Sequence, residues 1–168
     1  FNIDAKSESD GKSNKDAIVN VFLKVFNNSL GFCGAIPYIA DLERKLTEDG
    51  KYEEFKASYQ KVTAHDWYEE RHEFLSKQDR VVNALVDMGY MSEKAAWNWC
   101  DAAIGDYQIS IEDFAKRVKA YIDRMGNNHH VVFLVDEIGQ YIGDDSKLML
   151  NLQTVTEELG RACMGKAW

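Results

Sequence analysis

The sequence predicts a mainly α-helical protein with a few strands, and three observations support that fold class. Apolar residues recur at helical spacing through most of the 168 residues. Residue types that start or stop helices stand at the borders of these stretches. The helical period is interrupted by a single continuous apolar run, Val131–Val135. We therefore expect a helical protein in which one strand stands out.

Seven helices are predicted, each from an apolar stripe bounded by start and stop signals. They are expected to begin near Asp16, Pro37, Tyr52, Trp67, Ser92, Ser110 and, for the last, after Gly143. Their expected ends are near Gly31, Gly50, Val62, Met88, Gly105, Met125 and Gly160. Ser110 with Asp113 resembles a capping box, in which the serine hydroxyl accepts a hydrogen bond from the first turn of the helix.

The run Val131–Val135 is rich in β-branched residues and ends at two acids, Asp136 and Glu137. Such a run is typical of a strand that is buried on both faces, as in the interior of a parallel sheet. Phe1–Asp4 and Ala167–Trp168 are predicted to be further strand pieces. The expected sheet is therefore small.

Composition excludes several classes of protein. The chain is 45% hydrophobic and 29% charged, with a net charge of −8 and a pI near 5.0. No apolar run approaches the ~18 residues of a membrane span, and no secretion signal is visible, so no membrane partner is expected. The acidic balance gives no general attraction to nucleic acid. Cys33, Cys100 and Cys163 lack metal-site spacing and are typical of reduced thiols in a cytoplasmic protein.

The apolar run that ends in Asp136 and Glu137 matches the Walker B pattern of P-loop nucleotide hydrolases. A buried parallel strand presents its carboxyl end to the ligand crevice, where an aspartate can hold Mg²⁺ directly or through water. The following glutamate points the other way and can act as general base toward the attacking water. The alternative is a buried strand whose two acids only cap a loop, and the pattern by itself leaves both interpretations open.

The longer stretch Val131–Gly160, VVFLVDEIGQYIGDDSKLMLNLQTVTEELG, resembles the Walker B region of the large P-loop ATPases of bacteriophage-exclusion (BREX) systems, of the BrxC/PglY type. The opening FNIDAKS resembles the strand that those proteins place after their nucleotide-binding loop and helix. The resemblance implies that residues 1–168 are an internal fragment of an α/β P-loop NTPase domain. It implies a strand over 1–6, a helical insertion over 14–126, the Walker B strand over 130–137 and a helix over 144–160.

The resemblance also implies roles for individual residues. Asp136 would bind Mg²⁺, Glu137 would be the catalytic base, and Asp136, Glu137 and Gln140 would lie against the bound nucleotide. Gln140 would give polar support near the γ-phosphate, although a loop glutamine that satisfies backbone groups is the alternative. Mg²⁺ and ATP are the cofactors implied for the full-length protein. Other proteins of the anti-phage defence system and DNA are the partners implied, and the cytoplasm is the implied location.

The chain departs from the family because it lacks the phosphate-binding loop G-x-x-x-x-G-K-[ST]. Gly11-Lys12-Ser13 is superficially similar, but Lys6 stands where the first glycine is required, and intervening acids would repel phosphate. We interpret Gly11–Ser13 as a polar turn and helix cap. The chain also stops where the family continues into its next core strand. We therefore expect the fragment to be inactive alone, to bind no cofactor, and to expose strand edges that can pair with another copy.

A second hypothesis is a non-catalytic helical protein-interaction module. Met88-Gly89-Tyr90 is similar to the loop of ubiquitin-associated modules and would form an apolar patch. The alternative is that Gly89 caps a helix and that Met88 and Tyr90 pack in the turn between two helices. Trp97 and Trp99 are two apart, so on a helix they point in different directions. One of them would face a neighbouring surface.

Two histidine-containing stretches have spacings that occur in metal sites. Glu69 and His72 have the E-x-x-H spacing of di-iron helices, but no second copy is present, and a solvated charged face is the better interpretation. His129 and His130 are interpreted as a loop before a strand.

Overall fold

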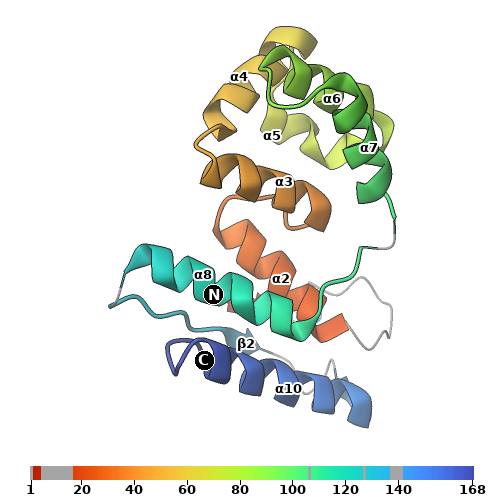
Figure 1. The fold of residues 1–168 in the computed structure, drawn as a ribbon. Coiled ribbons are helices and arrows are strands. Elements are labelled where there is room, and N and C mark those ends of the chain that lie inside the picture. Colours follow the sequence, from red (N-terminus) through yellow and green to blue (C-terminus); the bar gives the residue numbers. More distant parts are fainter. Residues whose placement is uncertain (1, 5–16, 106, 127, 137–141) are drawn as a thin grey trace. The chain divides into compact units, whose positions relative to one another are not determined.

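The computed structural model describes residues 2–4, 17–105, 107–126, 128–136 and 142–168. Across these residues the chain is mainly helical with two short paired strands, which confirms the predicted fold class at that level (Figure 1). The helices are α2 (Ala17–Ser29), α3 (Pro37–Glu48), α4 (Tyr52–Thr63), α5 (Trp67–Glu70), the 3₁₀ helix η1 (Arg71–Ser76), α6 (Gln78–Asp87), α7 (Glu93–Ala103), α8 (Ile111–Met125) and α10 (Ser146–Ala162). The strands are β1 (Asn2–Asp4) and β2 (Leu134–Asp136). No helix in the described ranges has the length and hydropathy that a membrane span requires.

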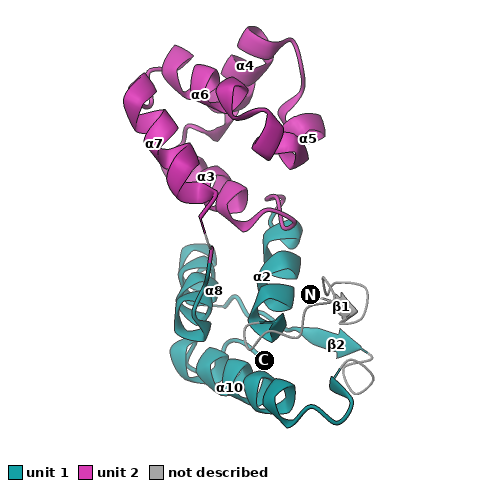
Figure 2. Ribbon diagram, turned by 90° about the vertical axis from the view of Figure 1, so that its right-hand side faces the viewer, with its two compact units in different colours: residues 1–30, 108–168 teal, residues 31–107 magenta. Residues whose placement is uncertain are grey.

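The chain divides into two compact units (Figure 2). Unit 1 contains Phe1–Leu30 and Gln108–Trp168, and unit 2 contains Gly31–Tyr107. Within the range 14–126, which we interpret as a helical insertion, only residues 31–107 form a unit of their own. Helices α2 and α8 belong to the unit that contains the strands.

Most predicted helix borders are confirmed, and each has a local cause. Pro37 stands at the first helical position of α3, where its missing N–H is not needed. The Ser110 hydroxyl accepts a hydrogen bond from the Asp113 backbone N–H at 3.0 Å and begins α8. Gly89 takes a positive φ of 68° after α6, and the Tyr90 N–H donates to the Leu85 carbonyl at 3.0 Å. This is the hydrogen bond of a glycine-based helix end.

The single helix expected from Trp67 to Met88 is wrong, because the chain forms α5, η1 and α6 in its place. The break falls at Lys77, whose φ of −132° and ψ of 33° are not helical. Its N–H donates to the Phe74 carbonyl three residues back, as in a 3₁₀ turn. Phe74 is fully buried at this point, so core packing sets the path of the chain here.

The expected end of the last helix at Gly160 is also wrong, because α10 continues to Ala162. Leu159 and Cys163 are both buried, so packing favours the extension of the helix through Arg161 and Ala162. The chain then turns at Gly165, which has a φ of +72° and donates its N–H to the Gly160 carbonyl at 3.0 Å. Gly165 therefore provides the left-handed conformation at this turn, and Gly160 lies within the helix.

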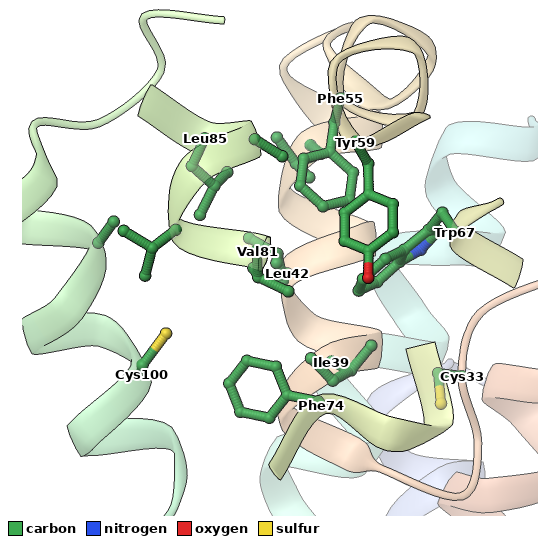
Figure 3. Close-up of a cluster of buried hydrophobic side chains, with 14 residues drawn as sticks. Cys33, Ile39, Leu42, Phe55, Tyr59, Trp67, Phe74, Val81, Leu85 and Cys100 are labelled. Atoms are coloured by element: carbon green, nitrogen blue, oxygen red, sulfur yellow. The ribbon is translucent and has the colours of Figure 1, made fainter. Parts of the chain in front are cut away.

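Unit 2 has its own apolar core, formed by helices that are close in sequence (Figure 3). Trp67 is one of its largest side chains and is fully buried. Its ring packs edge-on against Phe55 at 5.0 Å and Tyr59 at 5.1 Å between centroids. The buried members of the core are Cys33, Ile39, Leu42, Leu46, Phe55, Tyr59, Trp67, Phe74, Val81, Val82, Ala84, Leu85, Ala96 and Cys100.

Unit 1 is organised around the segment that leads into β2. Phe133 lies among aromatic rings of α2 and α8, with centroids 5.2 Å from Phe22, 6.5 Å from Phe26 and 6.1 Å from Phe114. Helix α10 packs along α2 and α8. These helices therefore cover one face of the strand segment.

The expectation that Val131–Val135 is buried on both faces is wrong for the described structure. Val131 and Phe133 are buried, whereas Val132 is 44% exposed and Leu134 is 60% exposed. Side chains alternate between the two faces of a strand, and α2 and α8 pack against the face that carries Phe133. A run of five apolar residues therefore has one buried face and one solvent-facing face.

This alternation predicts unequal effects of truncation at two neighbouring residues. Phe133→Ala removes a ring from a packed aromatic cluster and should lower the free energy of unfolding by about 3–5 kcal/mol. Leu134→Ala, the matched control on the other face, should change it by no more than about 0.5 kcal/mol. Urea denaturation followed by circular dichroism measures both. Equal losses would mean that the described register of the strand is incorrect.

Candidate functional site

The candidate site lies at the carboxyl end of β2, and peptide hydrogen bonds on both edges of this segment position it. The Val131 N–H donates to the Lys166 carbonyl at 2.9 Å, and the Trp168 N–H donates to the Val131 carbonyl at 3.1 Å. The resulting bridge between Val131 and Ala167 is parallel, which confirms the predicted C-terminal strand piece. On the other edge, β1 pairs in parallel with Leu134–Asp136 (Figure 2). The segment is therefore flanked by parallel chain on both sides.

Asp136 is the last residue of β2 and is exposed at its carboxyl end. The backbone of Asp4, the last residue of β1, is its partner in register. Carboxyl ends of parallel strands are the edge at which α/β sheets bind ligands. Of the predicted site residues, Asp136 is the one whose position the structure describes. Glu137 and Gln140 lie outside the described residues, as does Gly11–Ser13.

The chain that follows Asp136 returns to the sheet through α10. Asp145 begins this helix by accepting hydrogen bonds on its carboxylate from the N–H groups of Lys147 at 2.9 Å and Leu148 at 3.3 Å. The chain leaves α10 and enters the parallel bridge at Ala167. Residues 131–168 thus form a strand–helix–strand unit, the arrangement that joins neighbouring parallel strands. Asp136 stands at the strand-to-helix connection of this unit.

Metal-ligating side chains do not gather anywhere in the described ranges: no three His, Cys, Asp or Glu residues there could hold one ion. Glu69 and His72 are both exposed, on α5 and η1. His129 packs against Tyr121 with 5.2 Å between ring centroids, and His130 stacks on Trp168 at 5.5 Å. The two histidines lie in the loop before the strand, as predicted.

Unit 2 contains a buried carboxylate that sequence reasoning missed. Glu43 is fully buried on α3 and accepts four hydrogen bonds. Their donors are the Cys33 N–H at 2.6 Å, the Tyr52 hydroxyl at 2.9 Å, the Trp67 indole N–H at 2.8 Å and the Arg71 guanidinium at 2.9 Å. Burial and the Glu43 charge together raise the pKa of Tyr52. A buried charge that is paired and fully hydrogen-bonded holds its partners in one arrangement.

Glu70 forms a second polar centre in the same unit and is also buried. It accepts hydrogen bonds from the Tyr59 hydroxyl at 2.9 Å and from Lys77 at 2.7 Å. The Nη1 of Arg80 lies 2.6 Å from the Oε1 and 2.5 Å from the Oε2 of the same carboxylate. Burial alone would raise the pKa of Glu70. The hydrogen bonds from Lys77, Arg80 and Tyr59 outweigh burial and lower this pKa to about 2. Glu70 therefore stays ionised inside the fold at neutral pH.

A cysteine–histidine contact is present in unit 2 but lacks the features of a nucleophile. The Cys33 Sγ lies 3.6 Å from the His72 Nδ1. Cys33 is fully buried, and burial raises the pKa of its thiol. A reactive cysteine needs a lowered pKa and access to substrate. We assign this pair a structural role.

The Met88-Gly89-Tyr90 turn is a packed helix end, which is the second of the two interpretations offered for it. Met88 and Tyr90 pack against the core of unit 2, and the Tyr90 hydroxyl donates to the Asp49 carboxylate. Trp99 packs edge-on against Phe74 at 5.6 Å, whereas Trp97 is 38% exposed. The expectation that the two tryptophans point in different directions is confirmed.

Comparison with known proteins assigns neither a family nor a known fold to the chain. No protein-family model matches the chain, and no solved structure matches it.

The pKa of Glu70 predicts how the stability of unit 2 depends on pH. The folded-state value of about 2 is below the ordinary value of 4.5, so the stabilisation is fully present above pH 4.5. It is lost as the pH falls from 4.5 toward 2. Glu70→Gln should remove this contribution and lower the free energy of unfolding by about 1–3 kcal/mol at pH 7.

The measurement is urea unfolding of both proteins at several pH values, and the informative quantity is the difference between them. That difference should shrink between pH 4.5 and 2, because protonation of Glu70 in the wild type weakens the same hydrogen bonds. Asp66→Asn changes a nearby exposed carboxylate that caps α5 and serves as the control. A difference that stays constant down to pH 2 would contradict the assignment.

Proposed function

We propose that residues 1–168 are the Walker B segment of a Mg²⁺-dependent P-loop ATPase from a bacterial anti-phage defence system of the BREX type. Here the helical insertion and the partial parallel sheet derive from an α/β P-loop domain. The observation that carries the proposal is Asp136, exposed at the end of β2, which pairs in parallel with β1 and follows the parallel bridge between Val131 and Ala167. The sequence resemblance over Val131–Gly160 gives that position its chemistry.

The residues at this position suit the proposed cofactor. A carboxylate oxygen is a preferred ligand of Mg²⁺, and Asp136 presents one at the edge of the sheet where nucleotides bind. When bound, Mg²⁺ would supply positive charge against the phosphates, and Asp136 would be the residue that holds it. In this proposal Asp136 orients the ion, Glu137 accepts a proton from the attacking water, and Gln140 gives polar support near the γ-phosphate.

Activity would require the whole protein, because the sequence lacks a phosphate-binding loop. ATP turnover in that protein would drive assembly on DNA or on other defence proteins in the cytoplasm. These partners follow from the resemblance alone. Pairing of exposed strand edges with another copy remains part of the same proposal.

A non-catalytic helical interaction module is the second candidate. The observation that favours it is unit 2, which has a complete core of its own and an exposed Trp97 on α7. In that case Asp136 would only end a strand. The two candidates differ in what Glu137 does.

In a longer protein that carries G-x-x-x-x-G-K-[ST] upstream of Phe1, Glu137→Gln should lower kcat for ATP hydrolysis by about 10²–10⁴-fold, because the general base is lost. ATP binding should change little. Phosphate release and nucleotide titration measure the two quantities. Glu157→Gln, on the exposed surface of α10, is the matched control and should leave kcat unchanged.

Unchanged turnover in Glu137→Gln would refute the role of Glu137. An upstream reading frame without the phosphate-binding loop would refute the ATPase proposal and leave the interaction module.

The 168-residue chain provides a simpler experiment. Isothermal titration with Mg²⁺ and ATP should give no binding heat, because backbone N–H groups and a lysine that hold the phosphates are missing. The non-hydrolysable analogue is titrated in parallel to exclude slow turnover. Binding at micromolar ATP would contradict the expectation that the chain is inactive alone.

A further inference from the structure

The donors that surround the two buried carboxylates of unit 2 come from residues 31–107. The four donors to Glu43 and the three hydrogen-bonding partners of Glu70 all lie in this range. Ser58 adds a further link between α4 and α6, since its hydroxyl lies 2.8 Å from the Ala84 carbonyl and 2.9 Å from the Asp87 carboxylate. The buried carboxylates of Glu43 and Glu70 are therefore satisfied by residues of unit 2.

Each end of unit 2 makes a side-chain hydrogen bond within the unit. At the entry, the Gly31 carbonyl accepts a hydrogen bond at 3.0 Å from Arg71 of η1, whose guanidinium also binds Glu43 on α3. At the exit, the Tyr107 hydroxyl donates to the Asp41 carboxylate on α3 at 2.8 Å. The exit is thus linked to α3 directly, and the entry is linked to it through Arg71.

Unit 1 packs across the interruption in its sequence. Phe26 of α2 and Phe114 of α8 meet edge-on with 6.0 Å between centroids, and Phe26 also meets Tyr121 of α8 at 5.7 Å. The rings of Phe22, Phe26, Phe114, Tyr121 and Phe133 that make these contacts all belong to unit 1. The contact between α2 and α8 therefore does not depend on the residues between them.

We infer that residues 31–107 are an autonomous insertion domain, which folds and unfolds as its own cooperative unit and is closed by the hydrogen bonds of Gly31 with Arg71 and of Tyr107 with Asp41. This inference is independent of the proposed ATPase activity. The inference gives the helical insertion the bounds 31–107 in place of the predicted bounds 14–126. It also means that unfolding of one unit leaves the other unit folded.

Hydrogen exchange of the complete 168-residue chain, read by mass spectrometry, tests the inference. Ser58→Ala removes a buried link in unit 2 and should lower amide protection in α4 and α6 by about tenfold. Protection in α8 and α10 should stay within about twofold. Phe133→Leu, in unit 1, should give the converse result with little risk of unfolding. A loss of equal size in both units, from either variant, would overturn the inference.

A second variant tests the hydrogen bond between Tyr107 and Asp41 at the exit of unit 2. Tyr107→Phe keeps the ring and removes the hydroxyl that binds Asp41, and it should lower protection in α3 by about fivefold. Tyr121→Phe removes a hydroxyl from α8 in the other unit and should leave α3 unchanged. Unaltered protection of α3 in Tyr107→Phe would show that this hydrogen bond does not close the unit.

Discussion

The peptide hydrogen bonds on the two edges of residues 131–136 are the interaction on which unit 1 depends. They join the strand segment to β1 on one side and to Lys166–Trp168 on the other. Residues from the two ends of the sequence therefore pair with the same segment. Phe133 then fixes the face to which α2 and α8 pack. The same bonds place Asp136 at the carboxyl end of the strand. The hydrogen bonds that hold this unit together thus also position the candidate site.

Unit 2 is held together in a different way, by two buried carboxylates surrounded by donors. A buried ion pair adds little net stability compared with an apolar core of the same shape, but removal of one partner is costly. Glu43 and Glu70 therefore act mainly by restricting unit 2 to one arrangement of its helices. Each carboxylate fixes the relative positions of helices and loops that apolar packing alone would leave adjustable. Their partners are all local to the unit, which is consistent with a separate insertion.

Sequence reasoning succeeded where the signal is local. The borders at Pro37, Gly89 and Ser110 follow from backbone chemistry, and the apolar run located the strand. It failed where tertiary packing decides: the helix expected after Trp67 is broken at Lys77, next to the turn that carries the buried Phe74, and one face of the strand stays exposed.

The polar centres of unit 2 were also missed, although a signal existed. Glu43 lies within the apolar stripe of α3, and Glu70 falls between Trp67 and Phe74 at helical spacing. A charged residue on a predicted core face marks a buried polar centre, but its partners cannot be read from spacing.

The central claim is that Asp136 ends a segment, residues 131–136, that pairs in parallel with the C-terminal residues at Val131 and with β1 at Leu134–Asp136. It is tested most directly by NMR of the 168-residue chain. Cross-strand contacts of a parallel ladder should connect Phe133 with Trp168 and Val135 with Ile3. Contacts on one edge only, or an antiparallel pattern, would contradict it.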